Sequence, residues 1–284
     1  MAERVLVTGG AGYIGSHACK ALARAGFEPV VFDNLSTGWK GAVKWGPLVQ
    51  GDLMDRSSID NALASYRPVA VMHFAALSLV GESMKDPGRY WRVNTGGALN
   101  LLEACAAAEV RNFVFSSTCA TYGDQDGVLL TEDTPQRPIN AYGGSKLAIE
   151  QMLRDFGSAA ALSHVIFRYF NVAGADPEGE VGEQHVPETH LIPLMLDAVA
   201  GKRPALTVFG TDYPTRDGTC VRDYVHVTDL ADAHVLGLQR LLAGKGDAIY
   251  CLGTGRGFSV REVIDASRAV TNREVPVVIG ERRP

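Results

Sequence analysis

The sequence lacks the features of several broad classes of protein. No apolar run approaches the ~18 residues that a membrane-spanning helix needs, and the N-terminus has no signal-peptide pattern. The five cysteines are odd in number, scattered and without a C-x-x-C pair, which predicts reduced thiols in a cytoplasmic protein. With 27 basic and 32 acidic residues, the chain has no excess of positive charge for binding nucleic acid.

Motifs for phosphoryl transfer and metal-dependent hydrolysis are also missing. The sequence contains no P-loop and no H-E-x-x-H pattern, which disfavours kinase and zinc-protease chemistry. His185 and His190 are separated by four residues around Pro187, so they are not expected to share a helical face. We therefore predict no metal ion in this protein.

Short apolar runs alternate with helical spacing in the first 170 residues. Strands are predicted over residues 5–8, 29–33, 48–51, 69–74, 112–117 and 164–169. Helices are predicted over residues 14–25, 90–108, 142–156, 225–242 and 260–270. This alternation predicts an α/β fold with a doubly wound parallel sheet, the Rossmann arrangement.

The pattern weakens after Asn171, where glycine and proline become frequent between residues 174 and 218. We therefore predict two parts in this chain of 284 residues. Residues 1–170 form a nucleotide-binding Rossmann domain, to which core elements return around residues 225–245. Residues 171–284 form mainly a smaller, irregular substrate lobe.

A glycine-rich segment connects the first predicted strand to the first predicted helix. Residues 9–15 read Gly-Gly-Ala-Gly-Tyr-Ile-Gly and satisfy the G-x-G-x-x-G pattern of dinucleotide-binding turns. Asp33 follows this segment by roughly the number of residues, ~20, at which an acidic side chain accepts a hydrogen bond from the ribose 2′-hydroxyl. Because residues 34–38 hold no arginine or lysine for a 2′-phosphate, NAD is favoured over NADP. The alternative is a tight turn without a ligand.

A tyrosine and a lysine begin the predicted helix 142–156. Tyr142 and Lys146 are four residues apart, so a helix places them on one face. A lysine cation and an oxidised nicotinamide would both lower the tyrosine pKa, which would make the phenol a base. Thr118, after the predicted strand 112–117, supplies a hydroxyl that can relay a proton. Cys119 follows it without a neighbouring histidine and is not expected to be a nucleophile.

Together these motifs resemble the extended short-chain dehydrogenase/reductase family and, within it, the UDP-glucose 4-epimerases. The resemblance spans almost the whole chain and rests on residues 8–17, 33–35, 51–53, 73–76, 80–83, 115–123, 142–147, 168–171 and 221–227. It implies NAD-dependent epimerisation at C4 of a UDP-sugar, through transient oxidation to a 4-keto intermediate. No carboxylate follows Thr118 directly, unlike in related dehydratases and decarboxylases, which favours oxidation and re-reduction alone.

The resemblance also implies a set of site residues. The catalytic residues are Tyr142, Lys146 and Thr118. The cofactor site comprises Gly9, Gly12, Tyr13, Ile14, Gly15, Asp33, Asn34, Asp52, Leu53, Phe74, Ala75, Ala76, Asn94, Tyr142, Lys146 and Tyr169. The substrate site comprises Thr118, Tyr142, Asn171, His190, Leu191, Phe209, Arg222, Tyr224 and Arg283.

The sequence departs from the family pattern at several positions. Thr118 stands where serine is frequent, Ser78 where several relatives have lysine, and His190 where asparagine is common. The chain stops at Pro284, where the family continues with further substrate-binding residues. The identity of the preferred sugar therefore stays open between hexose, N-acetylhexosamine and pentose.

The resemblance implies a homodimer through the helices near residues 90–108 and 142–156. A non-catalytic NAD-binding regulator on the same fold is the alternative from another class.

Overall fold

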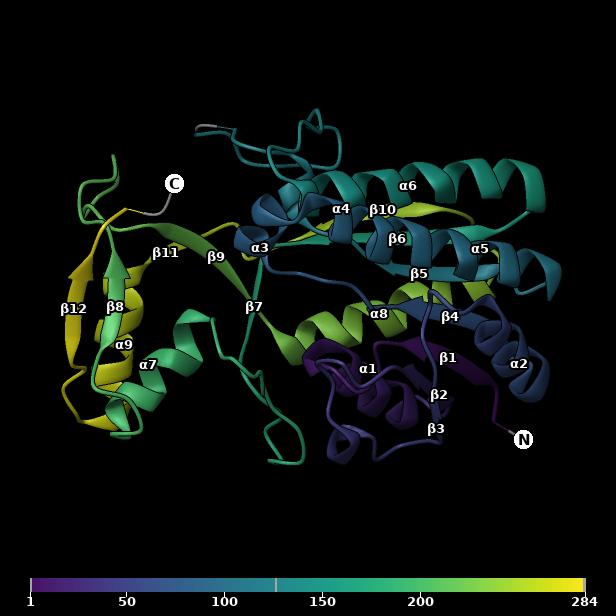
Figure 1. Cartoon of the computed structure of the whole chain (residues 1–284), viewed down its shortest axis with the longest axis horizontal. Coiled ribbons are helices and arrows are strands. Elements are labelled where there is room, and N and C mark those ends of the chain that lie inside the picture. The colour runs from purple at the N-terminus through teal and green to yellow at the C-terminus, as the bar shows by residue number, and fades with distance from the viewer. Residues whose placement is uncertain (1, 126, 283–284) are drawn as a thin grey trace.

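The computed structural model describes residues 2–125 and 127–282 and has a seven-stranded parallel sheet at its centre (Figure 1). The strands are β1 (Arg4–Thr8), β2 (Glu28–Asp33), β3 (Leu48–Gln50), β4 (Ala70–His73), β5 (Asn112–Ser116), β6 (Ser163–Tyr169) and β10 (Ala248–Leu252). Their order is β10-β6-β5-β4-β1-β2-β3, which confirms the predicted doubly wound α/β fold. The order reverses between β1 and β4, and ligands of such sheets bind outside the strand carboxyl ends at that point.

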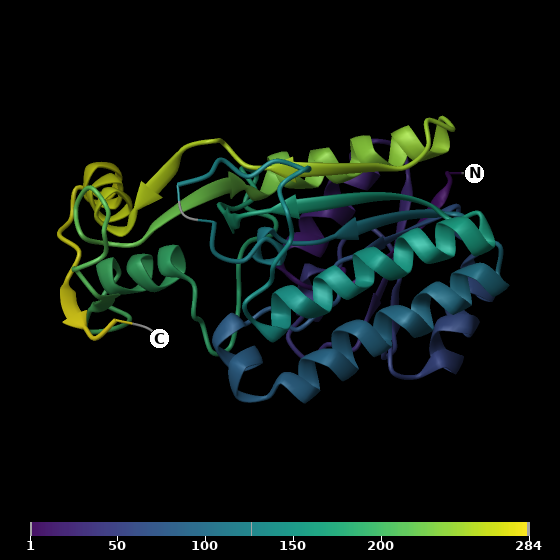
Figure 2. The ribbon, with the colours of Figure 1, turned by 90° about the horizontal axis from the view of Figure 1, so that it is seen from above.

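Helices cover both faces of this sheet (Figure 2). On one face, α1 (Tyr13–Arg24) lies beside α8 (Val227–Leu242), and both contribute to an apolar cluster with the strands. The other face carries α2 (Arg56–Tyr66), α5 (Gly97–Ala107) and α6 (Ala141–Ala160), which pack on a second apolar cluster. The four residues of β4 are all buried, as expected for a central strand covered on both sides.

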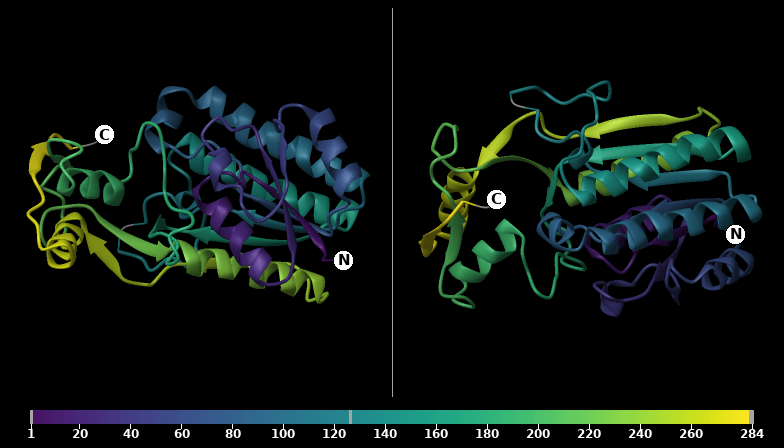
Figure 3. Two further views of the ribbon diagram at one scale, coloured as in Figure 1. Left: turned by 90° about the horizontal axis from the view of Figure 1, so that it is seen from below. Right: turned by 45° about the horizontal axis from the view of Figure 1, so that its top comes forward.

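The second lobe stands at one end of the sheet (Figure 3). It contains α7 (Leu191–Val199) and α9 (Val260–Thr271) beside the parallel pair β8 (Leu206–Phe209) and β12 (Val277–Gly280). Its own small core is formed by Met195, Ala198, Leu206, Val208, Ile264 and Val275. The three-stranded sheet of β7 (Asn171–Ala173), β9 (Val221–His226) and β11 (Gly257–Ser259) lies between this lobe and the main sheet.

Several elements differ from the sequence-based predictions. The predicted helix 90–108 consists of the end of α4 (Pro87–Tyr90), a π-helix (Trp91–Gly96) and α5. The predicted helix 225–242 begins only at Val227, because β9 continues through His226. The pattern predicted neither α2 nor β10, the seventh strand, which pairs with β6 beyond the expected return at 225–245. The short α3 (Val80–Lys85) precedes α4, and single 3₁₀ turns cover Lys40–Ala42 and Cys119–Thr121.

None of the helices over residues 2–125 and 127–282 is both long enough and apolar enough to cross a membrane.

Candidate active site

A cavity of about 660 Å³ opens at the carboxyl ends of the central strands, where the strand order reverses. Its volume lies in the range of small-molecule sites. Most of the predicted site residues line it: Gly9, Gly12, Tyr13, Ile14, Gly15, Asp33, Asn34, Asp52, Leu53, Phe74, Ala75, Ala76, Thr118, Tyr142, Lys146, Tyr169, Asn171, His190 and Arg222. Ser78, one of the departures from the family pattern, also lines it.

Four predicted site residues lie outside the cavity lining. Asn94 is buried in the π-helix, where its amide bonds both the N–H and the carbonyl of Leu77 at 2.8 and 3.0 Å and so fixes the loop after β4. Leu191 begins α7 and packs on the core of the second lobe. Phe209 ends β8 in the same lobe, and Tyr224 lies within β9. Arg283 is outside the described residues.

The glycine loop places backbone atoms closer together than side chains would allow. Gly9 has a positive φ of 72°, and a Cβ there would lie 2.6 Å from the backbone nitrogen of Ala75. A Cβ on Gly15 would overlap the carbonyl oxygen of Gly9. Gly12 caps α1 without a side chain, and the first residues of the helix, Tyr13, Ile14 and Gly15, line the cavity. Such a helix N-terminus suits a pyrophosphate, and the loop therefore fits a dinucleotide.

Two carboxylates follow at the ends of the neighbouring strands. Asp33 ends β2 and is buried; its two oxygens accept the N–H groups of Ala11 at 3.0 Å and Leu35 at 2.8 Å. Burial raises the Asp33 pKa, while these two hydrogen bonds oppose the rise. Each oxygen keeps a further lone pair for a ribose hydroxyl. Asn34 donates to Asp52 at 3.0 Å and joins the two strand ends.

The tyrosine and the lysine lie at the start of α6, above the end of β5. Asn140 caps the helix by accepting the N–H of Gly143 at 2.8 Å. The Lys146 ammonium is buried and donates to the carbonyl of Ser116 at 2.9 Å. The Thr118 hydroxyl forms a hydrogen bond with the Tyr142 phenol. The structure thus brings the three predicted catalytic side chains into one cavity.

Burial dominates the electrostatics of this pair. It raises the pKa of Tyr142 to about 12, and the hydrogen bond from Thr118 opposes the rise. It also lowers the pKa of Lys146 to about 7, against the attraction of Glu150. The expectation that Lys146 lowers the Tyr142 pKa is therefore wrong for the protein without NAD. In that state the group that lowers the Tyr142 pKa is the Thr118 hydroxyl. A phenolate at neutral pH requires the positive charge of an oxidised nicotinamide as well.

A buried ion pair supports α6 one turn after Lys146. Glu150 is fully buried and receives three hydrogen bonds from Arg168, the shortest with 2.7 Å between Nη2 and Oε2. Ser117 donates to the same carboxylate at 2.6 Å, and Gln136 at 3.1 Å. This network ties the catalytic helix to β5 and β6. Glu150 follows Tyr142 and Lys146 at the same four-residue spacing, and this spacing is the signal in the sequence that places its carboxylate on the same face of the helix.

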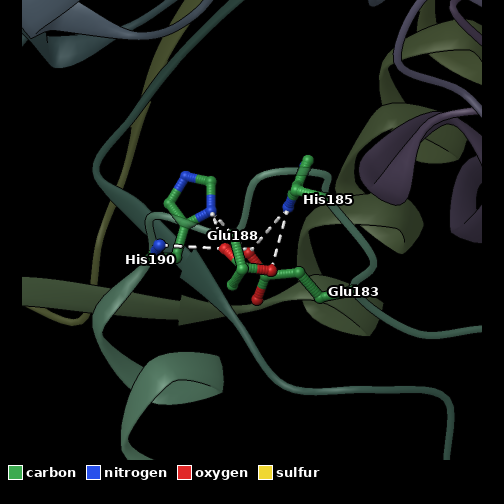
Figure 4. A group of neighbouring side chains, drawn as sticks. All are labelled: Glu183, His185, Glu188 and His190. Carbon is green, nitrogen blue, oxygen red and sulfur yellow. Dashed lines mark hydrogen bonds and ion pairs between the residues drawn. The ribbon is translucent and has the colours of Figure 1, made fainter. Parts of the chain in front are cut away.

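His185 and His190, which the sequence does not place on one helical face, lie close together in the structure. His185 and His190 lie in the loop before α7, with ring centroids 4.9 Å apart (Figure 4). The two residues do not share a helical face, as predicted, and the path of the loop brings their side chains together instead. Glu183 and Glu188 lie between them, and Glu183, His185 and His190 line the cavity.

A glycine turn, a strand-end carboxylate and a Tyr/Lys/Thr group in one cavity define a dinucleotide-dependent α/β enzyme of the dehydrogenase type. The chain belongs to the NAD dependent epimerase/dehydratase family, whose model matches residues 5–253.

Proteins of known activity resemble it over nearly its full length. The UDP-glucose 4-epimerase of Rhizobium leguminosarum bv. trifolii is 54% identical over 99% of this chain and 86% of the relative. The structure of UDP-glucose 4-epimerase from Brucella ovis in complex with NAD has a TM-score of 0.96 at 51% identity, covering 99% and 87% of the two chains. The enzyme from Stenotrophomonas maltophila, with bound NAD and formylated UDP-arabinopyranose, has a TM-score of 0.94 at 41% identity, with the same coverage.

Proposed function

We propose that this protein is an NAD-dependent 4-epimerase of UDP-sugars that interconverts UDP-glucose and UDP-galactose. The observation that carries the proposal is the convergence of Tyr142, Thr118 and Lys146 in the cavity that the glycine loop enters. The similarity to UDP-glucose 4-epimerases over 99% of the chain supports the same activity.

The chemistry follows from these side chains. Tyr142 removes the proton from the sugar 4-hydroxyl, either directly or through the hydroxyl of Thr118. NAD supplies the acceptor and later the donor of a hydride. Lys146 is buried and lines the same cavity, where its ammonium contributes positive charge while the phenol oxygen is ionised. The 4-keto sugar turns over within the cavity, and Tyr142 returns its proton to the new alcohol. Cys119 and Ala120 follow Thr118, so no adjacent carboxylate promotes elimination or decarboxylation.

The substrate side of the cavity is assigned by the same proposal. Asn171, at the start of β7, and Arg222, on β9, line the cavity and are assigned to the nucleotide-sugar. His190 lines it beside them. The proposal also assigns Leu191, Phe209 and Tyr224 to the substrate, on elements next to the cavity lining, together with Arg283, which is outside the described residues. On this proposal, residues 1–170 with α8 and β10 hold NAD, and the remaining parts of residues 171–284 hold mainly the substrate.

Product analysis with a panel of UDP-sugars tests this function. Purified protein is incubated without added NAD, and the products are identified by mass spectrometry and sugar chromatography. We expect UDP-galactose from UDP-glucose with no change in mass, because the hydride removed is returned. Faster turnover of an N-acetylhexosamine or pentose nucleotide would reassign the sugar. A product lighter by water or carbon dioxide would reject epimerisation, and no turnover of any sugar would favour an NAD-binding regulator.

We infer that the protein forms a homodimer through the helices near residues 90–108 and 142–156, with α3 and α4 beside them. A groove between these helices is lined mainly by apolar side chains, among them Met84, Trp91 and Ile139. Met84 is 62% exposed and Ile139 66% exposed, and apolar surface of this extent is typical of a site that a partner covers.

The free cysteines, three of them buried, fit a reducing compartment, and we propose the cytoplasm.

Sedimentation velocity tests the dimer. We expect the parent to have twice the mass of one chain, and the Met84→Glu variant to dissociate at least ~10-fold more readily, because it places a charge in an apolar interface. Val270→Glu is the matched control, since Val270 is 86% exposed on α9 in the second lobe. A monomeric parent, or equal dissociation of both variants, would reject this interface.

A further inference from the structure

The loop between β7 and α7 gathers two histidines and two glutamates that the proposed reaction does not use as a group. We call Glu183, His185, Glu188 and His190 the His–Glu cluster. Their four potential ligand atoms lie within 4.8 Å of one another, and the side chains point toward a common centre (Figure 4). The two carboxylates are the more enclosed members, with side chains 9% and 14% exposed.

The distances within the cluster match the edges of a coordination polyhedron. The Nδ1 atom of His190 lies 2.8 Å from Glu183 and 3.1 Å from Glu188. The Nδ1 atom of His185 lies 3.5 and 3.4 Å from the same two carboxylates. Four ligands about 2.1 Å from a central ion would be about 3.4 Å apart in a tetrahedron. Small shifts of the side chains would therefore bring all four atoms into contact with one ion.

Imidazoles, rather than ammonium or guanidinium groups, are the partners of the two carboxylates of the cluster. Within the described parts of the chain, the ion pairs of Glu183 and Glu188 are only those with these two histidines. The Nδ1 atom of His185 is buried and has no hydrogen-bond partner, although it faces both carboxylates. Asp176, nearby in sequence, differs in this respect, because Lys20 already lies 2.8 Å from its carboxylate.

We propose that the His–Glu cluster binds one divalent transition-metal ion in the wall of the cavity. Two imidazole nitrogens with two carboxylate oxygens suit Zn²⁺ or Mn²⁺ better than Mg²⁺ or Ca²⁺, which prefer oxygen alone. The inference goes beyond the proposed epimerase reaction and needs no step of it. The ion neutralises Glu183, whose carboxylate otherwise faces a cavity shaped for nucleotide phosphates.

The expected consequence is a tethered loop. Its neighbours already hold it against the first domain: Trp39 donates to the carbonyl of Gln184 at 3.1 Å, and Tyr13 packs edge-on against His185 at 6.4 Å. A metal ion adds a link between residues 183 and 190, at the two ends of the turn that precedes α7. Zinc should therefore slow proteolysis within this loop as well as bind to it.

The test is direct metal binding to the NAD-loaded protein. After dialysis against EDTA, we expect calorimetric titration with Zn²⁺ to show one saturable site per chain. Co²⁺ should give visible absorption without a thiolate charge-transfer band, which excludes the cysteines as ligands. Glu183→Gln, which removes a negative ligand at constant shape, should weaken binding at least ~10-fold. His185→Gln is a second variant, with the same expected loss, in case the first does not fold.

Glu178→Gln is the matched control, because it makes the same charge change earlier in the same loop. It belongs to the acidic group around Lys20, so it also tests whether metal binds there. We expect unchanged Zn²⁺ affinity in this variant, with far-ultraviolet dichroism and NAD content reported for all the proteins. The proposal is overturned by a parent without a saturable site, by unchanged affinity in both cluster variants, by a thiolate band with Co²⁺, or by loss of binding in Glu178→Gln.

Discussion

The Tyr142→Phe variant is expected to lose ~10²–10⁴-fold in kcat while it keeps its fold and its NAD. The substitution removes only the phenol oxygen, which bonds Thr118, and retains a ring of the same size at the start of α6. Since the loss concerns the proton acceptor and not the binding surface, KM for the UDP-sugar should change much less than kcat. Steady-state kinetics, with NAD content measured by nucleotide release, separate the two effects.

The Lys146→Ala variant tests whether the pair acts as one unit. Removal of the ammonium should slow the reaction, because the phenolate formed during turnover then lacks a neighbouring positive charge. The residual activity should rise with pH more steeply than that of the parent, since burial favours the neutral phenol and alkali restores the phenolate. The double variant should be little slower than the slower single variant. A folded Tyr142→Phe protein with kcat within a few-fold of the parent would overturn the mechanism and leave the regulator as the better hypothesis.

The parts of the structure that the sequence predicted are those determined by local signals. The buried strands around Leu6 and Val71 appear as short apolar runs, and the glycine loop lies directly between a strand and a helix. Each of these features is set by neighbouring residues. The spacing of Tyr142 and Lys146 is likewise a property of a single helix turn. The cavity that they share lies where the strand carboxyl ends meet at one edge of the sheet.

The parts that were missed depend on contacts between distant residues. Strand β10 pairs with β6 across about eighty residues of sequence, and its half-exposed pattern carries no strong periodic signal. The convergence of His185 with His190 depends on the path of an irregular loop, for which spacing rules give no guide. The pKa of Tyr142 was mispredicted for a related reason: the sequence showed a lysine on the same helix face, but not the burial that raises the tyrosine pKa.

Glu150 illustrates how such distant contacts support the site. It lies four residues after Lys146 on α6, and its partner Arg168 comes from β6. Both side chains are almost wholly buried, at 0% and 2% exposure. Removal of one member of a buried pair leaves an uncompensated charge, which typically costs ~3–5 kcal/mol. The exposed pair of Arg56 and Glu103, at 35% and 51% exposure, belongs to a class that contributes only ~0–1 kcal/mol.

The Glu150→Gln variant should therefore lose ~3–5 kcal/mol in free energy of unfolding, measured by urea denaturation of the NAD-free protein. Glu103→Gln makes the same change at the exposed pair and should cost no more than ~1 kcal/mol. Adding Arg168→Met to Glu150→Gln should cost less than the sum of the single losses, because the unpaired charge is then removed. If the two glutamine variants are equally stable, Arg168 has found another counterion, and the network does not anchor the catalytic helix as described.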